Sequence, residues 1–158
     1  MKYTEGDYEA VHTSPVWRSR ANFIFAAHLG VKDGRNEWEQ LWGEKTAQGR
    51  CVLCCIPFFT YDVALGDEVE TDSESMLKTV VKRSGQVTFR LWLDGQSPDE
   101  RQITAVEIEK MGALLEWSSD NLLALSVPEG NAVRIAAYLH KQEQDGRLQY
   151  ETGQSLKN

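Results

Sequence analysis

Three cysteines stand close together, and thiols at such spacing could bind a metal ion or act as a nucleophile. The segment Cys51-Val52-Leu53-Cys54-Cys55 suits a β-strand, in which successive side chains point to opposite faces. Cys51 and Cys54 would then face opposite sides, so they cannot converge on one tetrahedral zinc ion. A disulfide between the adjacent Cys54 and Cys55 would be strained. We interpret all three as buried structural thiols and predict neither a metal nor another cofactor.

A cysteine nucleophile also needs a histidine beside it and a third group that orients this histidine. The three histidines, His12, His28 and His140, fall on separate predicted elements. His28 could face Cys55, but nothing in the pattern places it there. We therefore predict that the protein is not an enzyme.

A run of carboxylates is the strongest functional signal. Between Cys51 and Leu77 there is no basic residue, and the acidic residues of this stretch are Asp62, Asp67, Glu68, Glu70, Asp72 and Glu74. Like charges this close repel one another, so the run favours a partner that supplies lysine or arginine. The net charge of the whole chain, -7, points the same way. The alternative is a solvated loop whose charges lie in water.

Trp92 is a second candidate for contact with a partner. Residues 86–93 alternate in hydrophobicity as a strand does, and Trp92 falls on the polar face. Aromatic side chains on an otherwise wet surface often anchor interfaces. The alternative is that the N-terminal half of the chain covers Trp92.

The C-terminal half, residues 86–153, alternates strands and helices. The strand over residues 86–93 leads into a helix, a hairpin over residues 113–127, a second helix and a short final strand. Right-handed crossovers would place both helices on one face of a four-stranded antiparallel sheet. This is the ferredoxin-like βαββαβ arrangement.

The first of these helices has a well-marked start. Ser97 and Glu100 have the spacing of a capping box, and Pro98 occupies the first helical position. Ile103 and Val106 follow at helical spacing. We expect these two side chains to face the core.

Residues 1–85 are predicted to be strand-rich. Short apolar runs separated by turns indicate five or six strands, although Trp38 and Trp42 suit either a helical turn or a strand face. Short strands without a convincing helix imply a small, curled, barrel-like sheet. No linker separates this half from residues 86–153, so the two should pack together, with residues 154–158 as a tail. The fold class is therefore α+β.

No segment of the sequence resembles a membrane span or an export signal. Every apolar run is far shorter than the roughly 20 residues that a spanning helix needs. The residues after Lys2 contain no apolar stretch. We predict a cytoplasmic protein with reduced thiols and no membrane contact. Its negative charge opposes direct binding to nucleic acid.

One segment resembles a bacterial protein family. Residues 56–61, Ile-Pro-Phe-Phe-Thr-Tyr, followed by Leu-Gly-Asp-Glu-Val at residues 65–69, are similar to the family known as domain of unknown function 4265. The resemblance extends over about residues 23–150 and departs from the family at Cys54-Cys55, where polar residues are expected. The family has no established activity. The resemblance therefore implies an architecture and a bacterial origin.

Some small acidic proteins of this sort are immunity proteins that are paired with secreted toxins, and this analogy favours such a role. The leading hypothesis is an acidic immunity protein that neutralises a cognate, basic toxin through the carboxylate run, with Trp92 as an apolar anchor. The alternative is a homodimeric regulatory domain that senses a small molecule with its ferredoxin-like half. A third hypothesis is an enzyme built on one of the cysteines.

Overall fold

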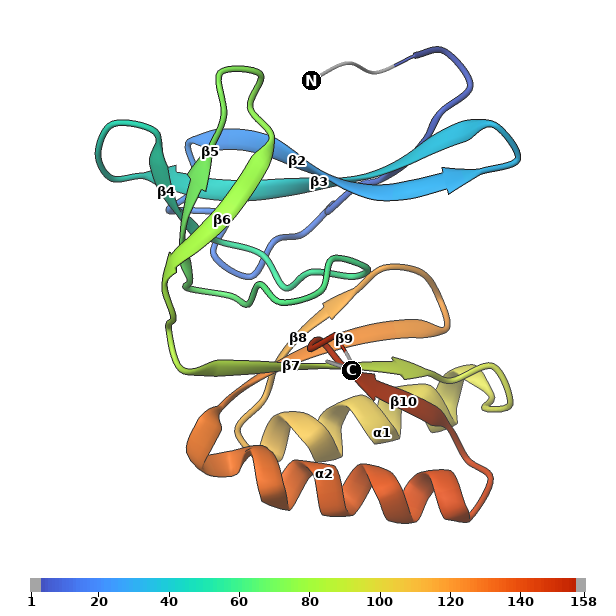
Figure 1. Cartoon of the computed structure of the whole chain (residues 1–158). Coiled ribbons are helices and arrows are strands. Elements are labelled where there is room, and N and C mark those ends of the chain that lie inside the picture. The colour runs from blue at the N-terminus through green and yellow to red at the C-terminus, as the bar shows by residue number, and fades with distance from the viewer. Residues whose placement is uncertain (1–3, 156–158) are drawn as a thin grey trace.

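A long hairpin organises the N-terminal half in the computed structural model, which describes residues 4–155 (Figure 1). Its strands, β2 (Phe23–Lys32) and β3 (Arg35–Lys45), pair antiparallel. Asp33 and Gly34 form the turn between them, and both have positive φ angles, a conformation that glycine and aspartate tolerate. Trp38 and Trp42 thus belong to a strand.

Four shorter strands complete this sheet. They are β1 (Tyr8–Ala10), β4 (Arg50–Leu53), β5 (Glu68–Thr71) and β6 (Leu77–Lys82). The order is β1-β3-β4-β5-β6, with β2 on β3, and all pairs are antiparallel except β1 with β3. The inner face buries Phe25, Leu41, Leu53 and Val69 in one core cluster.

The N-terminal sheet curls but does not close into the predicted barrel. Barrel closure needs a continuous ladder between the first and last strands. In the part of the chain that the structure describes, the strand pairing between β2 and the β6 side of the sheet is limited to an isolated bridge between Ala26 and Met76. The pairing of β5 with β6 also has register shifts at Glu68/Val69 and Glu70/Thr71, which bend the ladder.

The C-terminal half forms a second sheet with two helices on one of its faces (Figure 1). Its elements are β7 (Gln86–Trp92), α1 (Pro98–Lys110), β8 (Leu114–Trp117), β9 (Leu122–Pro128), α2 (Glu129–Gln144) and β10 (Gln149–Thr152). The strand order is β10-β7-β9-β8, and every neighbouring pair is antiparallel. The α+β class predicted from the sequence is confirmed. None of the described helices is long and apolar enough to cross a membrane.

Helix α1 starts as predicted but presents a different face to the sheet. Ser97 accepts the backbone N–H of Glu100, and the Glu100 side chain accepts the backbone N–H of Ser97. The buried residues are Thr104, Ala105 and Ile108, whereas Ile103 is 60% exposed and Val106 is 40% exposed. The predicted orientation was wrong because α1 has apolar residues on both sides, and spacing alone cannot choose between them.

The segment between β4 and β5, residues 54–67, lies between the two sheets (Figure 1). Ile56, Phe58 and Leu65 from this segment form a buried cluster with Ala124 of β9. The two halves therefore pack against each other as predicted, and the side chains of residues 54–67 form the contact between them. The residues that resemble the bacterial family lie here.

Candidate functional site

The carboxylate run does not gather into one free acidic surface. Asp67 is 1% exposed and accepts the backbone N–H groups of Ala64 and Ser84 at 2.9 and 2.8 Å. The guanidinium of Arg83 lies 3.3 Å from the same carboxylate. Asp67 thus holds a turn together inside the protein. Asp62 accepts the backbone N–H and the hydroxyl of Ser155 at 2.9 and 2.5 Å, so it fastens the C-terminal residues.

The other four carboxylates lie on β5 and the turn that follows it. The guanidinium of Arg50 lies 3.9 Å from Glu68 and 3.7 Å from Glu70, because β4 and β5 place Arg50 opposite Glu70. Asp72 accepts the backbone N–H groups of Glu74 and of Met76 and so stabilises its own turn. The expectation of a run without cationic neighbours was therefore wrong, because strand pairing brings in cations that are distant in sequence.

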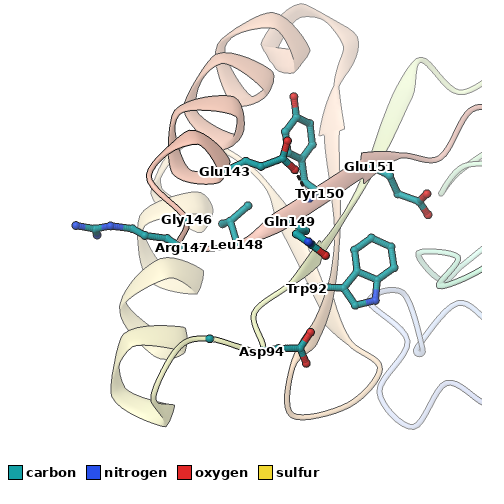
Figure 2. Close-up of a pocket in the computed structure, with 10 residues that line it drawn as sticks. Trp92, Asp94, Glu143, Gly146, Arg147, Leu148, Gln149, Tyr150 and Glu151 are labelled. Atoms are coloured by element: carbon teal, nitrogen blue, oxygen red, sulfur yellow. Dashed lines mark hydrogen bonds between the residues drawn. The ribbon is translucent and has the colours of Figure 1, made fainter.

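Trp92 lies apart from these carboxylates, on β7 of the other sheet. It is half-buried and lines a cavity of about 810 Å³, none of whose lining residues belongs to the run (Figure 2). The structure therefore does not bring the seven predicted binding residues into one site.

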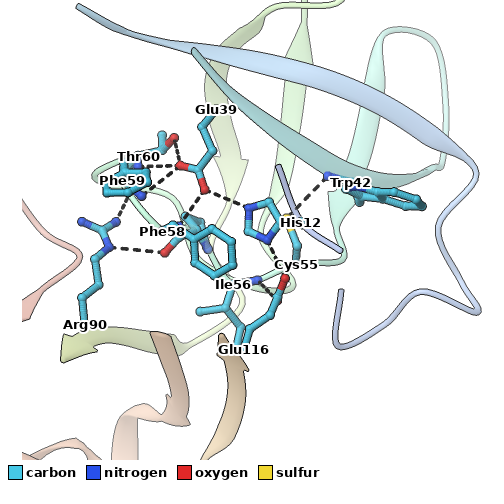
Figure 3. A network of polar contacts seen from close by, with 11 residues as sticks. His12, Glu39, Trp42, Cys55, Ile56, Phe58, Phe59, Thr60, Arg90 and Glu116 are labelled. Carbon is cyan, nitrogen blue, oxygen red and sulfur yellow. Dashed lines mark hydrogen bonds and ion pairs between the residues drawn. The ribbon is translucent and has the colours of Figure 1, made fainter. Parts of the chain in front are cut away.

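The most organised polar chemistry surrounds His12, which follows β1 and is only 2% exposed. Its Nδ1 lies 2.5 Å from Oε1 of Glu116, and its Nε2 lies 2.8 Å from Oε2 of Glu39 (Figure 3). The imidazole ring stacks on Phe58 with 4.0 Å between the ring centroids. Glu39 and Glu116 are 0% and 3% exposed, so water does not reach this cluster.

Strand alternation explains how two carboxylates reach the same buried histidine. Glu39 lies on the inner side of β3, two residues before Leu41, and β1 pairs with β3 so that Ala10 lies opposite Glu39. This register places His12, two residues after Ala10, beside the carboxylate of Glu39. Glu116 on β8 faces the N-terminal half, because its neighbour Leu115 packs on the opposite side with the helix-covered core.

Glu39 also organises the segment at the junction. Its carboxylate accepts the backbone N–H groups of Phe58, Phe59 and Thr60 at 2.6, 3.0 and 2.8 Å and the Thr60 hydroxyl at 2.7 Å. With His12, five donors thus converge on one carboxylate. Such hydrogen bonds stabilise a buried charge that would otherwise be costly.

The charges in this cluster reinforce one another. Burial alone would lower the pKa of His12, but the sulfur of Cys55 and the carboxylates of Glu116 and Glu39 outweigh it and raise the pKa to about 12. Burial would raise the pKa of Glu39, but hydrogen bonds from His12, Thr60 and the backbone hold that pKa below its ordinary value. We conclude that His12 is an imidazolium between two carboxylates at neutral pH.

Arg90 secures the same segment from the C-terminal sheet. It is fully buried, and its guanidinium donates to the backbone carbonyl groups of Pro57 and Thr60. It also donates to Glu151 of β10 at 3.0 Å, and it lies over the ring of Tyr61. The segment is therefore held by Glu39 from one sheet and by Arg90 from the other. We call His12, Glu39, Arg90 and Glu116, with residues 54–61, the junction network.

The junction network is unsuited to catalysis as it stands. Each ring nitrogen of His12 donates to a carboxylate, so neither has a lone pair with which to accept a proton. Cys55 lies close to His12, but it is 0% exposed, and burial raises the pKa of its thiol. Burial likewise raises the pKa values of Cys51 and Cys54 to about 11. The prediction of buried, unpaired thiols is confirmed.

Two further sequence expectations concern the cysteines. It is His12, not His28, that lies beside Cys55. Cys51 and Cys55 share one core cluster with Leu53, and Cys54 is not among the members of that cluster, in keeping with the prediction that Cys51 and Cys54 face opposite sides. Within residues 4–155, no group of three or more histidine, cysteine, aspartate or glutamate side chains is arranged to hold a metal ion.

Sequence reasoning missed the junction network almost entirely. A signal was present for Glu39, which shares a strand face with the apolar Leu41, and for Arg90, which stands between Phe89 and Leu91. A charged residue in such a place is buried only with partners. His12 follows the apolar Val11 and precedes the polar Thr13, and this local sequence gave no signal.

Comparison with known proteins places the chain in a group without assigned activity. The family described as domain of unknown function (DUF4265) matches residues 39–150. No curated protein matches the chain. A solved structure of a hypothetical protein from Neisseria gonorrhoeae is 19% identical, with a TM-score of 0.70, and the match covers 83% of this chain and 93% of that one. At this identity the likeness shows a shared fold only.

Proposed function

Because the chain belongs to the DUF4265 family, whose function is unknown, we propose its function from the geometry: it is a binding protein that neutralises a basic protein partner, as an immunity protein neutralises its toxin. One observation carries this proposal. In residues 4–155 the clustered histidine, cysteine and carboxylate groups are sealed at the junction, while the charges left at the surface are predominantly acidic. This distribution of groups is better suited to binding a charged partner at the surface than to catalysis.

The proposed contact surface is the acidic edge, which we define as Glu68, Glu70, Asp72 and Glu74. Asp72 and Glu74 are exposed, and Glu68 and Glu70 are half-buried on β5. Arg50 between Glu68 and Glu70 keeps their side chains in place and reduces their net field. A basic partner would displace or share this cation. Long-range attraction by the remaining charge of the molecule would speed encounter.

Asp62 and Asp67 are not part of the proposed surface. Asp67 is buried, and Asp62 is engaged by Ser155 near the C-terminal end. If the partner is a nuclease toxin, the carboxylates of the acidic edge would occupy the positions of substrate phosphates. This is the finer form of the proposal.

The regulatory alternative finds less support. We propose that the strand order β10-β7-β9-β8, with both helices on one face, makes the C-terminal half ferredoxin-like. A sensor of that kind would bind its ligand between the open sheet face and a second subunit. Here that face is covered by residues 54–61, and its side chains Arg90 and Glu116 are buried.

The proposal is tested by co-expressing the protein with the product of the neighbouring gene and purifying the complex. The matched variants are E68Q/E70Q/D72N/E74Q at the acidic edge and D99N/E109Q/D120N/D145N elsewhere on the surface, which remove the same charge. We expect the first variant to weaken binding at least tenfold at low salt, and the second to weaken it far less.

Three results would contradict the proposal. They are the absence of a stable complex, an affinity that does not change with ionic strength, and equal losses in both variants. The last result would show that net charge alone, and not the acidic edge, attracts the partner.

A further inference from the structure

The cavity that Trp92 lines is used by none of the predicted functions. It lies where the end of β7, the C-terminal end of α2 and β10 meet (Figure 2). Trp92 falls on the sheet face opposite the helices, since its strand neighbour Leu91 packs in the helix-covered core. The indole thus forms an aromatic wall beside a cavity of about 810 Å³.

Three carboxylates line this cavity, and each accepts a hydrogen bond that holds its position. Glu151 accepts Arg90 at 3.0 Å and the Tyr61 hydroxyl at 2.7 Å, yet its side chain remains 34% exposed. Glu143 accepts the backbone N–H of Tyr150 at 3.0 Å. Asp94 accepts a hydrogen bond from the Asn121 side chain. A ligand would therefore meet acceptors that are already oriented, which lowers the entropy lost on binding.

Arg147, a cation that also lines the cavity, does not occupy the space between Trp92 and the carboxylates of Asp94 and Glu151. Figure 2 shows the side chain of Arg147 extending away from Trp92, on the opposite side of the close-up from the carboxylates of Asp94 and Glu151. Arg90 offsets the charge of Glu151, so the uncompensated negative charge beside the indole comes from Asp94. An aromatic face with carboxylates beside it is the arrangement that attracts a cation with an apolar stem.

We propose that this cavity receives a lysine or arginine side chain of the protein partner. The charged end of such a side chain would lie between the face of the indole and Asp94, Glu143 or Glu151, and its methylene stem would follow the apolar edge of the ring. The inference rests on the proposed function, because a basic protein is the partner that supplies such side chains. It assigns Trp92 a role that differs from an apolar anchor, namely a receptor for a cation.

The test uses the full-length protein and tetra-arginine and tetra-lysine peptides, with tetra-glutamine as the uncharged control. The readout is the indole N–H resonance of Trp92 in NMR spectra, identified by its loss in W92L. We expect the basic peptides to shift this resonance in a saturable manner. W92L should weaken binding of the peptides about threefold, as measured by calorimetry, since a cation–π contact at an exposed site has this size.

A pair of double variants separates the cavity from the general charge. D94N/E143Q removes two carboxylates from the cavity, and D99N/E109Q removes two from the exposed surface of α1. The first should weaken peptide binding about threefold and the second by much less. Equal effects, or an equal shift with tetra-glutamine, would overturn the inference.

The same variants distinguish failure of this inference from failure of the proposed function. If the purified complex forms with unchanged affinity in W92L and in D94N/E143Q, the cavity is not the receptor, although the binding function stands. If no partner binds but the basic peptides still shift the Trp92 resonance, the cavity binds cations and the proposed function fails.

Discussion

The junction network and the acidic edge use the same kinds of charged group in opposite ways. At the junction, Glu39 has five donors and no contact with water, whereas Glu70 shares one exposed arginine with Glu68. Removing water makes each interaction at the junction strong and each unmade interaction costly. A charged residue therefore reveals little about function until its solvent exposure is known.

The largest contrast should appear in the reactivity of the thiols. Cys55 lies in the sealed region, and all three cysteines are buried with raised pKa values. We expect iodoacetamide at pH 8 to modify the native protein at least about a thousandfold more slowly than the protein in guanidinium chloride, because modification requires opening. Mass spectrometry gives the rates. Rapid modification of one thiol in native buffer would show that the junction is not sealed and would support the cysteine-enzyme hypothesis.

Replacing Glu39 should destabilise the protein far more than replacing Glu70. Glu39→Ala leaves the Nε2–H of His12 and three backbone N–H groups buried without their acceptor, which should reduce the free energy of unfolding by about 3–5 kcal/mol. Glu70→Ala should cost less than about 1 kcal/mol. Both are measured by guanidinium unfolding followed by tryptophan fluorescence. Glu39→Gln keeps the shape and one acceptor, so it gives an intermediate value if Glu39→Ala does not fold.

The buried charges of the junction network should also make the stability of the protein depend on pH. His12 titrates near 6.5 when unfolded and near 12 when native, so its contribution is complete below pH 6.5 and is lost as the pH rises towards 12. The lowered pKa of Glu39 acts in the other direction: its contribution is present above pH 4.5 and is lost as the pH falls through the lower native value. Together they place the greatest stability between pH 4.5 and 6.5.

We expect the free energy of unfolding to fall by up to about 1.4 kcal/mol per pH unit between pH 7 and 8.5, the limit for one proton. His12→Gln should flatten this slope, whereas His28→Gln, at an exposed position, should leave it unchanged. Parallel slopes in the wild type and in His12→Gln would show that His12 is not an imidazolium in the native protein.

The smallest effect is expected at Arg50, the cation within the acidic edge. Arg50→Gln removes two long, partly exposed ion pairs, so the free energy of unfolding should change by less than about 1 kcal/mol. The same change should raise the association rate with a basic partner, since it leaves Glu68 and Glu70 uncompensated. Stopped-flow mixing at several salt concentrations measures this rate. A slower association would mean that Arg50 itself contacts the partner.

The elements of this fold were largely predictable because they depend on local patterns. The alternation over residues 86–93 and the capping box at Ser97 correctly predicted β7 and the start of α1. The face of α1 was not predictable, because Ile103 and Ile108 are equally apolar and only the position of the sheet distinguishes them.

The junction network was beyond sequence reasoning for a different reason. His12, Glu39 and Glu116 are brought together by pairings between elements up to 104 positions apart. Nothing local to any of the three specifies the others. The pairing of β4 with β5 likewise puts Arg50 beside Glu70, so the acidic run is not without a neighbouring cation.

The imidazolium that joins the two halves also limits which segments of this chain can be replaced by those of a relative. Its two carboxylates come from different sheets, and the family match at residues 39–150 includes both of them but excludes His12. A fragment cut to the match would leave two buried negative groups without their cation. A chimera that takes its C-terminal half from a relative should fold only when that half supplies an acid at the position of Glu116, however similar the remaining residues are.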